Sequence, residues 1–154
     1  MDKLQKIFTV KNLGESEFHS GCNYRKDNKG FWCIGTKMYV TEALEKVKEI
    51  LHKPNLEEGN NTLGQEPTPM SESFKPVLNQ SELLSAKGHR KFQQLVGIAQ
   101  WLITCGWFDI SFAVISINRF SSVPLNRHMK VAVRIFKYLN KTPECRIRID
   151  PSKN

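Results

Sequence analysis

The residues of this 154-residue sequence that could recognise a ligand are concentrated between positions 90 and 103. Read as a helix, this segment has an apolar side with i, i+3, i+4 and i+7 spacing, formed by Phe92, Leu95, Val96, Ala99, Leu102 and Ile103. The opposite side, called the Gln–Gly–Trp face, carries Arg90, Gln93, Gly97 and Trp101. A mid-helix glycine costs about 1 kcal/mol relative to alanine, so Gly97 indicates a close approach to the backbone.

The chemistry of the Gln–Gly–Trp face favours a nucleic-acid minor groove. The groove offers degenerate hydrogen-bond acceptors and requires close approach, which a glutamine amide, a flat indole ring and a bare backbone can provide. The alternative is helix–helix packing through a glycine notch, with Trp101 half-buried beside it. The sequence of this helix alone leaves both interpretations open.

A second candidate binding element is the helix predicted over residues 127–140. Its basic side chains recur within about 80° of one another around the helix axis and extend over about 20 Å. This cationic stripe consists of Arg127, Lys130, Arg134, Lys137 and Lys141. Phosphates along a duplex match such a stripe and give affinity through counterion release. The alternative is an ordinary solvated helix face. His128 lies toward the apolar side, so a packed or capping role is expected for it.

The charge distribution also points to a polyanionic partner. The net charge is +8, and residues 86–154 hold twelve Lys and Arg against three Asp and Glu. Residues 54–85 hold one basic residue against five acidic ones. A basic C-terminal half is the electrostatic footprint expected for nucleic acid. An anionic membrane is the rival partner, but the apolar stripes are narrow and match a protein core.

Composition excludes several other classes of protein. The 40% hydrophobic and 25% charged fractions are typical of a globular domain. No apolar run approaches the roughly 18 residues of a membrane span, and the first residues lack a signal peptide's apolar region. We therefore expect an intracellular protein, cytoplasmic or nuclear and not secreted. The four cysteines have no metal-ligand spacing and are expected to be free thiols: Cys22, Cys33, Cys105 and Cys145.

The predicted fold class is α+β. In chain order we expect the end of a helix at 3–12, a β-hairpin of 18–24 and 31–34, a helix at 37–51, three helices at 85–105, 110–120 and 127–140, and a strand at 146–150. Asp109 and Asn126 are placed as N-caps of the last two helices. The expected divisions are a hairpin and helix (1–53), a linker (54–85), a helical bundle (86–145) and a following strand (146–154).

The ordered motifs resemble the thumb and adjoining palm of copia-type (Ty1-like) retrotransposon reverse transcriptases. The resemblance covers nearly the whole chain. It is carried by Leu13-Gly14-Glu15, Gly21, Gly35, Tyr39, Pro67-Thr68-Pro69-Met70, Gln93-Gln94-Leu95-Val96-Gly97, Trp101, the run from Phe108 to Val114, Asn118-Arg119-Phe120, Pro124, His128, and the run from Arg134 to Thr142. Within this family, the face that matches the Gln–Gly–Trp face tracks the template–primer minor groove.

The resemblance implies further expectations. The bundle would be a three-helix thumb, the partner an RNA–DNA hybrid or duplex DNA, and Gly21 would lie in the strand pair that holds the primer's terminal phosphate. His19 and Ser20 replace the large apolar residues that usually precede this glycine. Gly106-Trp107-Phe108 replaces a common Thr-Arg-Pro. The palm and fingers portion with the catalytic aspartates would lie upstream of Met1, and the ribonuclease H carboxylates would lie beyond Asn154.

The chain itself has no recognisable catalytic centre. Two-metal phosphoryl transfer needs carboxylates close enough to share divalent ions. The four aspartates, Asp2, Asp27, Asp109 and Asp150, include no adjacent pair and no Tyr-x-Asp-Asp. We expect no cofactor here, since Mg²⁺ would belong to the missing catalytic part, and no activity of the chain alone. The predicted function is template–primer grip as a fragment of a copia-type RNA-directed DNA polymerase. The alternatives are a stand-alone nucleic-acid-binding module and a decayed retroelement remnant.

Overall fold

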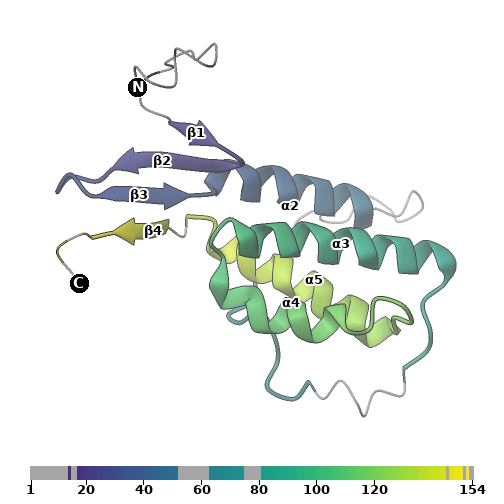
Figure 1. Cartoon of the computed structure of the whole chain (residues 1–154). Coiled ribbons are helices and arrows are strands. Elements are labelled where there is room, and N and C mark those ends of the chain that lie inside the picture. Colours follow the sequence, from purple (N-terminus) through teal and green to yellow (C-terminus); the bar gives the residue numbers. More distant parts are fainter. Residues whose placement is uncertain are drawn as a thin grey trace, which may run out of the picture.

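The computed structural model describes residues 14, 17–51, 63–74, 81–144, 146–150 and 152, and it confirms the α+β class. The predicted helix end at 3–12 lies outside the described residues. A small sheet lies at one end of a group of helices (Figure 1). In chain order the elements are β1 (Phe18–His19), β2 (Cys22–Lys26), β3 (Trp32–Gly35), α2 (Lys37–Leu51), α3 (Ala86–Thr104), the 3-10 helix η2 (Phe108–Ile110), α4 (Ser111–Asn118), α5 (Asn126–Lys141) and β4 (Arg146–Ile149).

The sheet is antiparallel throughout, with the order β1-β2-β3-β4. The predicted hairpin forms between β2 and β3, and the predicted C-terminal strand pairs with β3. The expectation of one strand over 18–24 was wrong, because the chain turns back at Ser20 and Gly21. Both residues have positive φ, +52° and +83°. This conformation is inexpensive for glycine and uncommon for serine, so β1 and β2 are separate short strands.

The helices follow the predicted periodicity, but two predicted caps were wrong. Asp109 lies inside η2, and its carboxylate accepts a hydrogen bond from the Tyr138 hydroxyl. Asn126 is the first residue of α5, and the cap position belongs to Leu125. The backbone N–H of Leu125 donates to Nδ1 of His128 over 3.1 Å, so His128 completes this helix start. The predicted packed or capping role of His128 is therefore confirmed.

One apolar core joins α2, α3, α4 and α5. Its members share almost complete burial and come from α2 (Val40, Leu44, Val47), α3 (Phe92, Leu95, Val96, Ala99, Leu102), α4 (Ala113, Val114, Ile117) and α5 (Val131, Ala132, Ile135, Phe136, Leu139), with Trp107 and Ile110 between α3 and α4. Each amphipathic helix thus turns its apolar stripe inward. Among the described residues, no helix has the length and apolar character needed to span a membrane.

Candidate nucleic-acid interface

The Gln–Gly–Trp face lies on the side of α3 opposite its buried stripe. Arg90, Gln93, Gly97 and Trp101 are all exposed, and Trp101 retains 44% of its accessible surface. A Cβ built on Gly97 would meet no described atom within 4 Å, apart from its chain neighbours and the backbone of its own helix. The alternative of a helix-packing notch was therefore wrong. The backbone at Gly97 is open to an outside partner.

The turn at Gly21 extends this face beyond α3. A Cβ on Gly21 would lie 3.6 Å from Cδ2 of Tyr39 and 3.7 Å from Nε1 of Trp101. The turn therefore sits directly against the indole ring at the C-terminal end of the face. Gly21, Gln93, Gly97 and Trp101 thus belong to one surface, although 80 residues of sequence separate Gly21 from Trp101. Tyr39, half-buried beside the turn, is a further member of this surface, which the sequence did not predict to be part of the site.

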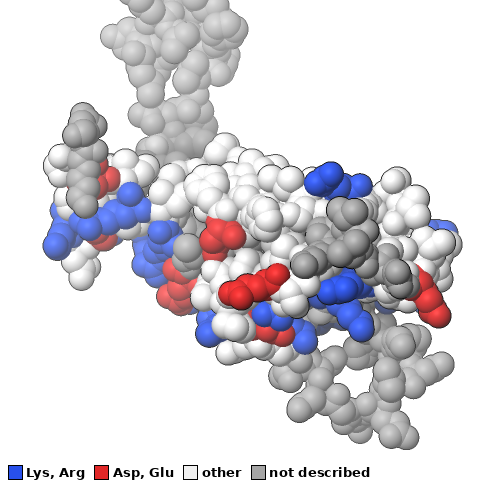
Figure 2. Space-filling model, turned by 90° about the horizontal axis from the view of Figure 1, so that it is seen from below, with Lys and Arg blue, Asp and Glu red and all other residues white. Residues whose placement is uncertain are grey.

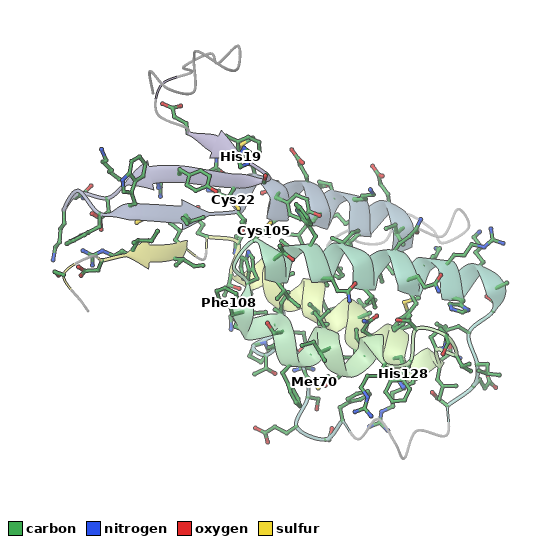
Figure 3. The ribbon with its side chains drawn as sticks, viewed as in Figure 1. His19, Cys22, Met70, Cys105, Phe108 and His128 are labelled. Carbon is green, nitrogen blue, oxygen red and sulfur yellow. The ribbon has the colours of Figure 1, made fainter. Side chains whose placement is uncertain are left out.

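Two cysteine thiols fix the turn to the end of α3. Cys22 Sγ lies 4.0 Å from the carbonyl oxygen of Cys105, and Cys105 Sγ lies 3.8 Å from the carbonyl oxygen of Ser20. Both side chains are buried and are free thiols, as predicted, and Figure 3 shows them at the junction of the sheet with α3. Burial, together with the neighbouring Cys22 thiol, raises the pKa of Cys105 to about 11. The Cys105 thiol is therefore neutral near pH 7, and both cysteine side chains contribute to the packing at this junction.

Trp107 makes a second connection between the sheet and the helices. Its indole N–H donates to Oγ1 of Thr36 over 2.6 Å, and both residues are buried. Gly106, which precedes it, has φ +110°, and a Cβ there would come within 2.5 Å of the Ile147 side chain. The departure from the family pattern at Gly106-Trp107-Phe108 thus has a structural role, because the glycine lets the sheet approach and the indole anchors it.

The N-terminal half of the Gln–Gly–Trp face is held by the loop between α4 and α5. Nε2 of His89 lies 2.6 Å from the carbonyl oxygen of Ser121, and the amide of Gln93 donates to the same oxygen over 3.3 Å. The Gln93 side chain is therefore oriented before any ligand binds. Pre-orientation of a polar contact lowers the entropic cost of binding.

The stretch of sequence that contains Gly97 and Trp101 has few charged residues. Between Lys91 and Arg119, Asp109 is the single charged residue in the sequence. Figure 2, seen from below the molecule of Figure 1, shows an uncharged area on the side where α4 lies. Large apolar side chains are exposed there at helical spacing: Phe108, Phe112 and Ile115. Apart from Arg90 at its N-terminal end, this face offers a nucleic acid close contact and hydrogen bonding rather than positive charge.

The cationic stripe follows the outer side of α5, but residues 63–74 lie against it. Arg134 donates to the carbonyl oxygen and Oγ1 of Thr68 over 3.1 and 3.2 Å, and it pairs with Oε2 of Glu66 at 3.0 Å. Arg127 donates to the Ser73 carbonyl oxygen over 3.3 Å and lies 5.6 Å from the ring centroid of Phe74. Two of the five cations are thus engaged within the protein.

The remaining cations of the stripe differ in exposure. Lys137 is half-buried, and its side chain lies 3.9 Å from the position of a Cβ on Gly64. Lys130 and Lys141 are exposed and make no hydrogen bond or ion pair with the described residues. A groove of about 440 Å³ separates part of the covering segment from α5. Part of the stripe therefore remains open to solvent.

The two predicted surfaces point in opposite directions. Helices α3 and α5 pack directly on each other through their buried stripes, as their arrangement in Figure 1 also indicates. The outer side of each helix therefore faces away from the other helix. The structure brings Gly21 together with the Gln–Gly–Trp face, and it leaves the cationic stripe on the far side of the bundle.

The described residues contain no group of three or more His, Cys, Asp or Glu side chains that could hold a metal ion. A two-metal site for phosphoryl transfer needs such a group.

Comparisons with known proteins point to mobile genetic elements. A retrovirus-related Pol polyprotein from transposon RE1 of Arabidopsis thaliana is 27% identical over 143 residues, which are 93% of this chain and 9% of that protein. A putative transposon Ty5-1 protein of Saccharomyces cerevisiae is 26% identical over 140 residues, which are 91% of this chain and 41% of that protein. No family model and no solved structure matches. Similarity along nine tenths of the chain supports a retrotransposon origin and a part of a retroelement polyprotein.

Proposed function

We propose that this chain is the template–primer gripping part of a copia-type RNA-directed DNA polymerase. The Gln–Gly–Trp face and the Gly21 turn lie in the minor groove of an RNA–DNA hybrid or duplex DNA. The observation that carries the proposal is the open backbone at Gly97 beside an exposed Trp101, with a second glycine turn against the same ring. One unobstructed backbone position, an adjoining glycine turn and a flat ring on one surface suit a partner that must come close.

The cationic stripe has a secondary role in this proposal. Because it faces away from the Gln–Gly–Trp face, one straight duplex cannot contact both surfaces at once. Lys130 and Lys141 then contribute to the positive field that attracts nucleic acid, and they do not hold the phosphates of the seated duplex. Arg127 and Arg134 chiefly stabilise the packing of residues 63–74.

The chemistry of polymerisation is assigned to another part of a polyprotein. The chain spans less than half of each of the two relatives, and its described residues contain no group of three or more His, Cys, Asp or Glu side chains that could hold a metal ion. The Pol polyprotein named for the Arabidopsis relative is compatible with a gripping module joined to a separate catalytic centre.

The decisive experiment compares one added methyl group on each side of the bundle. In Gly97→Ala the methyl enters the space where a duplex would approach. Duplex affinity should fall, while the free energy of unfolding holds or rises by up to about 1 kcal/mol, because alanine favours a helix. In the control, Gly64→Ala, the new Cβ makes an ordinary contact 3.9 Å from the Lys137 side chain on the α5 side. Its duplex affinity should match that of the unchanged protein.

The measurements are fluorescence anisotropy with a labelled hybrid duplex and thermal unfolding of the same samples. Equal affinity of the Gly97→Ala and Gly64→Ala proteins, both stably folded, would refute minor-groove contact by α3. The outcome cannot be confused with misfolding, because the melting temperature is recorded for every protein.

A further inference from the structure

A basic groove on the sheet is not accounted for by the proposed duplex contact. It has a volume of about 590 Å³, and its lining includes Asn23, Arg25, Gly35, Lys37 and Arg146. The strand register sets Asn23, Gly35 and Arg146 in one cross-strand row. Because Gly35 has no side chain, the middle of this row is low, and the flanking side chains form the walls. Figure 2 shows Lys and Arg side chains gathered at the sheet end of the molecule.

The groove contains more cations than its carboxylates neutralise. Lys37 and Arg146 both pair with Glu144, Arg146 over 3.4 Å. The Arg25 side chain makes no hydrogen bond or ion pair with the described residues. The hydrogen bond and charge of Lys37, together with the charge of Arg25, hold the pKa of Glu144 below its usual range. The positive charges of Arg25, Lys37 and Arg146 therefore lie near one ionised carboxylate, that of Glu144. Among the residues that line the groove itself, Glu17 is the one acidic residue.

Arg148, on the same sheet, has partners for its positive charge. Arg148 pairs with Oδ2 of Asp27 at 2.9 Å, and its guanidinium lies 4.2 Å from the ring centroid of Phe31. Arg25 lies in the same cross-strand row, because both Arg25 and Arg148 are paired with Cys33. The Arg25 side chain has no carboxylate and no aromatic ring as a partner among the described residues. The unsatisfied charge is thus localised to the groove and is not a general property of the sheet.

The groove begins where the proposed duplex surface ends. Nδ2 of Asn23 lies 3.5 Å from Sδ of Met38 at the inner end of the groove. Met38 is followed by Tyr39, whose ring contacts the Gly21 turn and thereby the Trp101 region. A strand leaving the Gln–Gly–Trp face past Gly21 would therefore reach Arg25, Lys37 and Arg146 next.

We infer that the groove formed by Arg25, Lys37 and Arg146 binds the phosphates of a single-stranded extension of the duplex seated on α3. Cationic grooves with aromatic side chains nearby are the usual means of holding single strands without sequence preference, and Trp32 and Tyr24 also line this groove. The inference extends the proposed function from the duplex to its unpaired continuation, and it rests on that function for the position of the duplex.

The test measures the gain in affinity that a single-stranded extension gives to a blunt hybrid duplex, with 3′ and 5′ extensions examined separately. The unchanged protein should bind one extended duplex about three- to tenfold more tightly than the blunt duplex, with a salt slope steeper by about 0.7 for each phosphate held. Arg25→Gln should abolish the gain and leave blunt-duplex affinity nearly unchanged. Glu144→Gln should increase the gain, because it removes the anion that competes for Lys37 and Arg146.

The matched control is Lys46→Gln, which removes one exposed positive charge from α2, away from the groove. It should keep the full gain. No gain from either extension would overturn the inference and leave the proposed function standing. Equal losses in Arg25→Gln and Lys46→Gln would also overturn it, since net charge alone would then explain binding. If the blunt duplex itself fails to bind, the proposed function fails, and a single-stranded oligonucleotide alone, tested against Arg25→Gln, decides whether the groove binds phosphates.

Discussion

The outer sides of α3 and α5 show that the more basic surface of a protein can be the less available one. On α3, the Gln–Gly–Trp face has little charge, and no described atom approaches the Gly97 position. On α5, five cations follow one side of the helix, but residues 63–74 lie against it and engage Arg127 and Arg134. Charge along a sequence attracts a polyanion over a distance, whereas contact requires an open surface.

The largest expected effect comes from placing the same new carboxylate on each surface. Gly97→Glu should weaken duplex binding at least about tenfold, because it sets a negative charge where phosphates and base edges approach. Lys130→Glu changes the net charge by twice as much, yet it should weaken binding by less than about threefold, through the long-range field alone. Titrations of one hybrid duplex at constant salt measure both. A larger loss for Lys130→Glu would reverse the assignment of the two surfaces.

A smaller effect is expected on stability when the contacts between residues 63–74 and α5 are removed. Arg134→Ala removes two hydrogen bonds to Thr68 and an ion pair with Glu66 whose side chains are only 26% and 28% exposed. We expect a loss of about 1–2 kcal/mol in the free energy of unfolding, measured by urea denaturation. Lys130→Ala should change it by no more than about 0.5 kcal/mol, as exposed sites usually do.

A double-mutant cycle with Glu66→Ala tests whether this loss comes from the pair itself. A coupling energy near zero would mean that Arg134 does not hold the segment. If Arg134→Ala instead leaves stability unchanged and sharply reduces duplex affinity, then Arg134 faces nucleic acid and the cover is not its role.

The smallest effect should appear with pH on the α5 side. His128 is buried, its ring lies 4.2 Å from that of Phe120, and burial lowers its pKa. An unfolded histidine, with a pKa near 6.5, takes up a proton more readily than this buried one. The folded state is therefore destabilised as pH falls below about 6.5 toward the lowered pKa, by at most about 1.4 kcal/mol per pH unit.

Melting temperatures recorded between pH 7.5 and 5.5 measure this loss. His128→Gln retains an acceptor for the Leu125 N–H but cannot titrate, so its melting temperature should depend less on pH in this range. An equally steep dependence in the variant would assign the acid sensitivity to other groups.

Local patterns predicted the elements whose stability is local. The helix at 37–51 matches its predicted position, because its apolar spacing specifies it within a few residues. A hairpin also forms as predicted, but its first strand is β2, which begins at Cys22 and ends at Lys26. The turn at Ser20 and Gly21 was missed, since serine rarely adopts a positive φ and gave no signal. The cap assignments failed at Asp109 and Asn126 because alternative partners, Tyr138 and His128, took part in the observed structure.

The candidate site was predictable in its residues but not in its grouping. The glycine at 97 indicated a close approach, and only the structure excluded another helix as the approaching element. Gly21 lies against Trp101, and Arg134 donates to Thr68. Both contacts join positions that are tens of residues apart in the sequence. Periodicity within one helix contains no information on such contacts. The sequence therefore did not predict that residues 63–74, within the expected linker of 54–85, lie against the cationic stripe.

The three tryptophans occupy three separate environments, so the chain contains its own optical probes. Trp107 is enclosed at the junction of sheet and helices, Trp101 is exposed against the Gly21 turn, and Trp32 lies in the sheet beneath the ammonium group of Lys26, 4.7 Å from its ring centroid. An indole's emission depends on its exposure to water and on nearby charge. Replacing the tryptophans in pairs would leave proteins with one emitting tryptophan each, without any attached dye. Trp107 would report on unfolding, Trp101 on the proposed duplex surface and Trp32 on the basic groove of the sheet.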